Sequence, residues 1–154
     1  MGRPFRAALV LAAGIGLGAL RELLFINLNY QIDHLRRATP WSFAHSRFQG
    51  LVADWDLPML TRLKWALAVL FVLLMWGLCL LLLRNAGMFR RLAGPVTIGF
   101  AGIALCAFLL HMAARWLPLE EASVNLLHAI QYPVLLLVLQ AALWVFPHLA
   151  AKER

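Results

Sequence analysis

Charged residues are scarce in this sequence, and their scarcity limits the class of protein that it can encode. Only 14% of the 154 residues are charged and 63% are hydrophobic, whereas about 25% of the residues in an ordinary soluble domain are charged. The mean hydropathy is +0.79. The composition therefore excludes an ordinary soluble domain and predicts a single membrane domain over residues 1–154, with little mass outside the bilayer.

Cysteines and catalytic motifs are also rare or missing. The only two cysteines, Cys79 and Cys106, lie in the middle of apolar runs without CxxC or metal-ligand spacing, and we interpret both as small buried apolar residues. No HExxH, GxSxG, Walker or Rossmann pattern occurs. Ser123 and His128 do not share a helix face, so they do not pair as nucleophile and base. The sequence argues against an enzyme and predicts no metal or resident cofactor.

Long apolar runs dominate what is present, and they predict an all-α integral membrane bundle of four transmembrane helices. Each run has about 20 residues, which matches the thickness of the hydrocarbon core. The first run has a basic start like that of a secretory signal, but no A-x-A site follows, so we expect an uncleaved span. The expected spans are residues 6–26, 62–84, 93–115 and 123–147, and the expected outer loop is residues 27–61.

Glycine and proline mark several expected contacts and boundaries. Gly14 and Gly18 form a GxxxG pair, a spacing that lets two helices approach closely. Gly87 suits the end of the second span, and Gly94–Pro95 suits the beginning of the third.

The expected outer loop contains an amphipathic segment. Its apolar side chains recur at helical spacing, at Phe48, Leu51, Val52 and Trp55. We predict a helix that begins near residues 39–40, lies on the membrane surface with its apolar face down, and ends before a break at residues 56–58. The alternative is an irregular loop with aromatic anchors.

The charges of the short connections predict the orientation. Residues 84–91 contain three Arg and no acid, whereas residues 115–123 contain one Arg and two Glu. The positive-inside rule therefore places residues 84–91 and both termini in the cytoplasm, and residues 27–61 outside it. The net charge of +7 is scattered between spans, which favours contact with membrane lipids and not with nucleic acid. We expect a multi-pass protein of the bacterial inner membrane.

Polar residues gather at one depth, near the outer ends of the expected spans. An adjacent ion pair inside an apolar run is costly in hydrocarbon and usually faces a bundle interior, water or the interface. One interpretation is interhelical hydrogen bonding, and the other is a ligand- or partner-binding pocket open to the outer side. The candidate residues are Arg21, Glu22, His111, Arg115, Asn125, His128, Gln131 and Tyr132.

Three further features of this polar layer bear on its chemistry. Pro133 has no N–H, so it should kink the fourth span and free the carbonyl of Ala129. His111 and His128 could ligate haem, as in a membrane redox subunit that binds haem or quinone. A channel or transporter subunit is another alternative, although the almost purely apolar cytoplasmic half argues against it.

Three stretches resemble small membrane proteins associated with the exosortase F system. They are the run RELLFINL at residues 21–28, Leu57–Pro58 before the second span, and YPVLL at residues 132–136. The likeness covers the architecture of the whole chain and about twenty residues by motif, while the second span lacks the Arg and Asn expected there. It implies a non-catalytic partner of a transpeptidase-like sorting enzyme, which itself supplies the catalytic residues. We therefore expect a non-enzymatic accessory subunit, with a membrane-protein partner, for envelope protein sorting, export or assembly.

Overall fold

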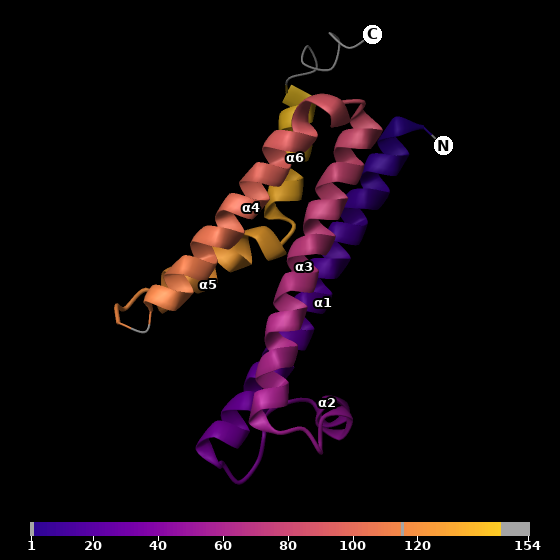
Figure 1. Cartoon of the computed structure of the whole chain (residues 1–154). Helices are drawn as coiled ribbons and strands as arrows, with labels where there is room; N and C mark the ends of the chain where they lie inside the picture. The colour runs from indigo at the N-terminus through magenta and orange to yellow at the C-terminus, as the bar shows by residue number, and fades with distance from the viewer. Residues whose placement is uncertain (1, 115, 146–154) are drawn as a thin grey trace. The chain divides into compact units, whose positions relative to one another are not determined.

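The computed structural model describes residues 2–114 and 116–145, and every regular element in them is a helix. This confirms the predicted all-α class (Figure 1). Three helices are long and apolar enough to cross a membrane, or four if the last two, bent by 52° at a break, form one span. The helices are α1 (Arg3–Arg37), α2 (Ser46–Leu51), α3 (Leu57–Ala86), α4 (Phe89–Ala113), α5 (Glu120–Gln131) and α6 (Val134–Val145).

The chain divides into two compact units, and α1 and α3 each contribute to both. The larger unit comprises Met1–Gly18 and Phe71–Arg154, and the smaller comprises Ala19–Leu70. An apolar core drawn from all five long helices stabilises the larger unit through close van der Waals packing of its side chains. The buried core residues are Val10, Met75, Cys79, Leu82, Phe100, Ile130 and Leu136.

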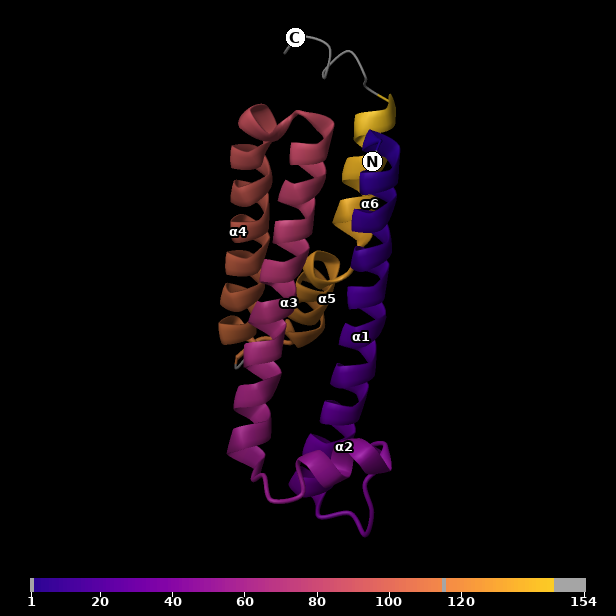
Figure 2. The same ribbon diagram turned by 90° about the vertical axis from the view of Figure 1, so that its right-hand side faces the viewer.

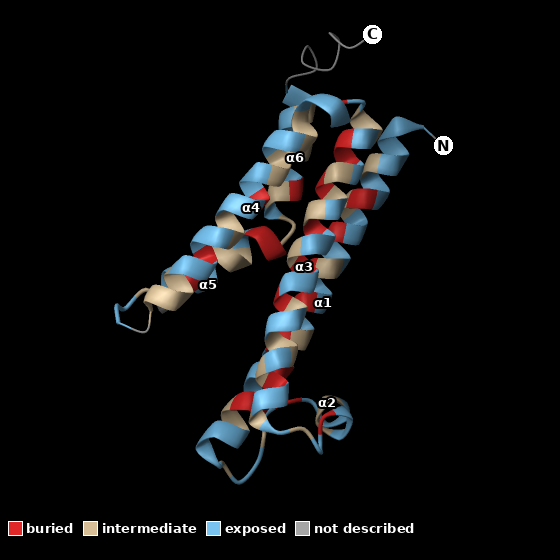
Figure 3. Ribbon diagram, in the orientation of Figure 1, coloured by how far each residue is buried: buried red, intermediate tan, exposed pale blue. Residues whose placement is uncertain are grey.

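The two cysteines differ in their surroundings. Cys79 is 1% exposed, which confirms the prediction that it is a buried residue. Cys106 is exposed, so the same prediction was wrong for it. The reason is that most of the surface of α4 is exposed, as Figure 3 shows. Among its described residues only Phe100 and Ala107 are buried.

Two side-chain hydrogen bonds join neighbouring helices of the larger unit. The indole N–H of Trp76 on α3 donates to the hydroxyl of Thr97 on α4 over 3.0 Å. The hydroxyl of Ser123 on α5 donates to the carbonyl of Ala107 on α4 over 2.9 Å. Both bonds satisfy polar groups inside an apolar unit, where a lone donor would be costly.

A tight turn joins α3 to α4 (Figure 2). Gly87 has a φ of +77°, and the N–H of Met88 bonds the carbonyl of Leu83 over 2.9 Å. Gly87 thus ends α3 as predicted, since glycine adopts this left-handed conformation at little cost. The predicted helix start at Gly94–Pro95 was wrong. The chain re-enters a helix directly after the glycine turn, at Phe89, and Pro95 lies inside α4, where it removes one backbone bond.

In the smaller unit, α1 continues through Asn27 to Arg37, so the expected loop begins eleven residues later than predicted. No glycine or proline interrupts residues 27–37, and Arg37 Nε pairs with Asp33 Oδ1 over 2.7 Å at i, i+4 spacing. The unit's core consists of Leu28, Ile32, Val52 and Leu60.

The amphipathic segment forms a shorter helix than predicted. α2 begins at Ser46, with His45 as its N-cap, and not near residues 39–40. Its predicted stripe also divides: Val52 is 4% exposed and packs in the core of the smaller unit, whereas Leu51 is 77% exposed. The predicted break at residues 56–58 was correct only for Asp56, whose carboxylate accepts the N–H of Met59 over 2.8 Å and caps α3. Leu57 and Pro58 already belong to α3, where proline is tolerated in the first turn.

Candidate functional site at the helix break

α5 and α6 are two halves of one apolar stretch, separated at Tyr132–Pro133. α5 ends at Gln131, α6 begins at Val134, and their axes differ by 52°. The prediction of a kink at Pro133 is confirmed, and the effect is larger than a kink because the helix divides in two. Pro133 cannot donate to the carbonyl of Ala129. The ends of both half-helices place further backbone groups without intrahelical partners near the break.

The helix break packs against the GxxxG pair of α1, Gly14 and Gly18. A Cβ added at Gly18 would lie 2.9 Å from Pro133 Cδ and 3.8 Å from Tyr132 Cδ1, and one added at Gly14 would collide with Leu136. Nothing lies within 4 Å of the same position at Gly16. The predicted close-packing face is therefore confirmed, and it is the absence of two side chains that lets the broken helix approach α1.

Three of the predicted site residues lie at the C-terminal end of α5. Gln131 is fully buried, at 0% exposure. The rings of His128 and Tyr132 meet edge to face, with centroids 5.8 Å apart, as their i, i+4 spacing predicts. Tyr132 itself has an extended backbone, and its N–H bonds the carbonyl of His128. The break thus combines an imidazole, a phenol, a buried amide and backbone carbonyls within one and a half helical turns.

Arg21 and Glu22 lie on α1 within the smaller unit. Arg21 Nη1 is 3.2 Å from Glu22 Oε2, and the two side chains are 4% and 47% exposed. The guanidinium also lies over the Phe25 ring, 4.5 Å from its centroid. The arginine is therefore desolvated and contacts both a carboxylate and an aromatic face, while the carboxylate remains half exposed.

The remaining predicted site residues are more scattered. His111 is half-buried in the last turn of α4, and Asn125 is exposed on α5. Arg115 lies outside the described residues. The predicted proximity of Arg21 and Glu22 to the third or fourth span stays a prediction. Among the residues that the structure describes, no group of three His, Cys, Asp or Glu side chains could hold a metal ion.

The sequence interpretation missed two buried polar residues on α1. Asn27 donates to the Leu23 carbonyl over 2.7 Å and accepts the N–H of His45 over 2.6 Å. Gln31, one turn later, is 8% exposed, and its Oε1 has no hydrogen-bond partner in the described part of the chain. Their i, i+4 spacing was the available signal, but it has no meaning in a segment interpreted as a loop.

Comparison of the chain with protein-family models, with curated proteins and with solved structures found no match. The resemblance to exosortase F-associated proteins stays a prediction from residues 21–28, 57–58 and 132–136. Each of these stretches has a defined structural place. The first contains the buried Arg21, the second opens α3, and the third contains the break before α6.

Proposed function

We propose that this protein is a non-enzymatic accessory subunit that binds another membrane protein through an exposed face of α4. The observation that carries the proposal is the exposure of this helix. Only 11% of its most apolar window is buried, against 33% for α3, and Figure 3 shows the contrast. The face, called the α4 face below, consists of Gly94, Ile98, Ala101, Gly102, Leu105 and Leu109.

The mixture of small and large residues on the α4 face favours a protein partner over lipid alone. Ile98 and Leu105 are 73% and 57% exposed, and an added Cβ at Gly94 or Gly102 would meet nothing within 4 Å. Glycine inside a helix costs about 1 kcal/mol relative to alanine. Acyl chains gain nothing from such a gap, whereas a second helix can approach the backbone there.

In this proposal α5 and α6 form one broken fourth span, and residues 84–91 and both termini are cytoplasmic. The three Arg of residues 84–91 support this orientation. α1 has 35 residues, about 52 Å at helical rise, against about 30 Å for the hydrocarbon core. Its end, together with α2, would then form an extracytoplasmic segment. The complex would serve envelope protein sorting, export or assembly in a bacterial inner membrane, as the exosortase F resemblance implies.

The polar residues around the break would contribute a ligand- or partner-binding site near the outer interface. The buried Gln131 and the division of the span support this, because non-helical backbone at membrane depth occurs where protein or a cavity surrounds it. The same division favours a second candidate, a small transporter subunit, since discontinuous helices commonly form transport sites.

Site-specific photo-crosslinking in native membranes tests the proposal. A photoreactive residue at Leu105 samples the α4 face, and one at Ile15, which is 55% exposed on α1, provides the control. We expect a discrete protein adduct from position 105 only, and its loss when Gly102→Trp blocks close approach. Identical adducts from both positions, or lipid adducts alone at position 105, would contradict an accessory role through α4.

A further inference from the structure

An apolar groove lies in the larger unit, where α3, α4 and α6 meet. It has a volume of about 280 Å³. On α4 it extends from Val96 to Ile103 and on α6 from Leu135 to Ala142, which is about 10 Å along each helix. That length covers most of one leaflet of a hydrocarbon core about 30 Å thick. The lining residues are Cys79, Val96, Gly99, Phe100, Ile103, Leu135, Val138, Leu139 and Ala142.

A strongly cationic turn adjoins this groove. Arg84 lies in the last turn of α3, and Arg90 and Arg91 lie in the first turn of α4. No acidic residue lies in that first turn, and no side chain caps it at Met88. The positive end of the helix dipole and these cationic side chains both favour an anion at this end of α4.

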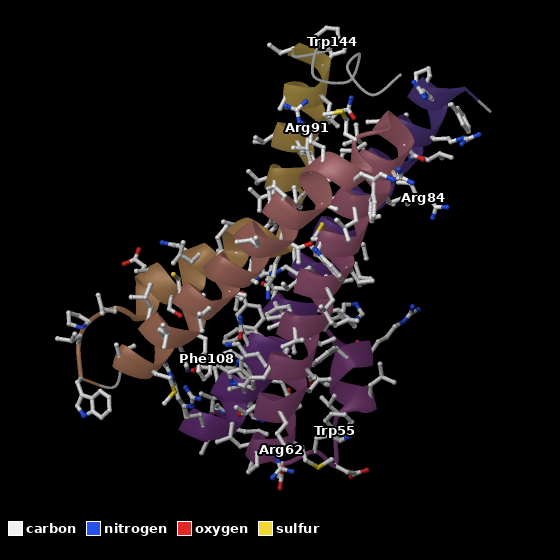
Figure 4. All side chains as sticks on the ribbon, turned by 45° about the horizontal axis from the view of Figure 1, so that its top comes forward. Trp55, Arg62, Arg84, Arg91, Phe108 and Trp144 are labelled. Carbon is white, nitrogen blue, oxygen red and sulfur yellow. The ribbon has the colours of Figure 1, made fainter. Side chains whose placement is uncertain are left out.

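The positions of the groove and the turn match the two parts of a phospholipid. The groove begins at Val96, about 8 Å along the helix from Arg91. On α6 it begins at Ala142, two residues before Trp144, which is 83% exposed. Figure 4 shows Arg84, Arg91 and Trp144 at the same end of this unit. Exposed tryptophan and arginine are the residues that membrane interfaces favour.

We propose that the groove and the turn together bind one anionic phospholipid, with an acyl chain along α4 and α6 and the phosphate at Arg84, Arg90 and Arg91. A partner helix would fill the groove without supplying an anion. A zwitterionic lipid would supply no net negative charge to three arginines, whereas basic sites between helices at this interface suit anionic head groups. The groove shares no residue with the α4 face, so the site does not depend on the proposed function.

Native mass spectrometry of the purified full-length protein tests this assignment. The protein is titrated in mild detergent with phosphatidylglycerol or with phosphatidylcholine of the same acyl chains. Gly99→Leu fills the groove, and because an added Cβ at Gly99 meets nothing within 4 Å, the fold should tolerate it. Gly77→Leu is the matched control, since Gly77 is an equally open, exposed position on α3 outside the groove. Ala142→Leu fills the groove from α6, should Gly99→Leu fail to fold by circular dichroism.

We expect one retained phosphatidylglycerol per protein, with phosphatidylcholine bound more weakly. Gly99→Leu or Ala142→Leu should abolish the retained lipid, and Gly77→Leu should leave it. The double variant Arg90→Gln/Arg91→Gln should weaken the binding of phosphatidylglycerol roughly 25-fold, since each basic residue contributes a factor of about five. Equal binding of the two lipids would overturn the proposal. So would unchanged phosphatidylglycerol binding in both folded groove-filling variants, which would show non-specific charge attraction only.

Discussion

At the scale of single residues, Arg21 shows how an apolar helix can contain a charge. Its guanidinium is desolvated on α1, where Glu22 supplies an opposite charge and Phe25 an aromatic face. Burying a charge costs free energy unless the groups that compensate it stay in contact with it. Glu22, by contrast, is half exposed, so solvent screens its charge and its share of the pair's stability is small.

Arg21→Ala should therefore destabilise the protein more than Glu22→Gln. We expect a loss of at least about 2 kcal/mol for Arg21→Ala, because the charged hydrogen bond to Glu22 and the contact with the Phe25 ring are lost. For Glu22→Gln we expect a loss of less than about 1 kcal/mol. Thermal unfolding in detergent, followed by circular dichroism, measures both. If stability is unchanged in Arg21→Ala and partner binding is lost, Arg21 acts in the site and not in the fold.

Asn27 is the second residue whose role the structure reveals. Its side chain donates to the Leu23 carbonyl and accepts the N–H of His45, so it fastens the loop before α2 to α1. Asn27→Leu should raise amide hydrogen exchange in residues 42–51 by about fivefold to tenfold, from the loss of about one net hydrogen bond. Asn27→Asp keeps the acceptor for His45 and should preserve protection. Equal exchange in all three proteins would show that the loop is held by other contacts.

At the scale of elements, the broken α5–α6 pair packs against α1 at Gly14 and Gly18. The break brings Pro133 against Gly18 and Leu136 against Gly14. A side chain at Gly18 would force the two elements apart, because the ring of Pro133 cannot turn away. At Gly14 the cost would be smaller, because the facing atom is the end of the flexible Leu136 side chain.

Gly18→Leu should accordingly destabilise the larger unit, whereas Gly16→Leu should not. We expect a loss of about 1–3 kcal/mol for Gly18→Leu through overpacking. Gly16→Leu should change stability by less than about 0.5 kcal/mol, since nothing lies near that position. Thermal melts of the two variants in the same detergent give the comparison. Equal melting temperatures would show that the glycines do not set the packing against the break.

The elements also show what the sequence could predict. Gly87, Asp56 and Pro133 act through local backbone chemistry, so each boundary they mark could be predicted from the residue and its neighbours. The extent of α1 could not be predicted, because polar residues after Ile26 resemble a loop until tertiary contacts with Val52 and Leu60 are known. Nor could the exposure of Cys106, since apolar periodicity cannot separate a core-facing helix side from a lipid- or partner-facing one.

The candidate site was predictable to a similar degree. The pairing of His128 with Tyr132 follows from helical spacing, and the pairing of Arg21 with Glu22 from adjacency. The contact of Pro133 with Gly18 joins residues more than a hundred positions apart. The sequence predicted the kink and the close-packing face separately, but not that the two meet. Asn27 was missed because the first span was predicted to end at residue 26, whereas α1 continues to Arg37.

At the scale of the whole molecule, the proposed topology depends on whether α5 and α6 together cross the membrane. Three other helices are long and apolar enough to do so. With four spans, the carboxyl terminus lies on the same side as the turn at residues 84–91. With three spans and a re-entrant α5–α6 pair, the carboxyl terminus lies on the opposite side.

Cysteine accessibility in intact cells decides between these arrangements. In a variant with Cys79→Ala and Cys106→Ala, single cysteines replace Ser42, Asn85 or Leu117, or follow Arg154, and an impermeant maleimide labels them from outside. The four-span topology predicts labelling at positions 42 and 117, and protection at position 85 and at the carboxyl terminus until the membrane is permeabilised. Labelling of the carboxyl terminus together with position 117 would contradict the four-span bundle.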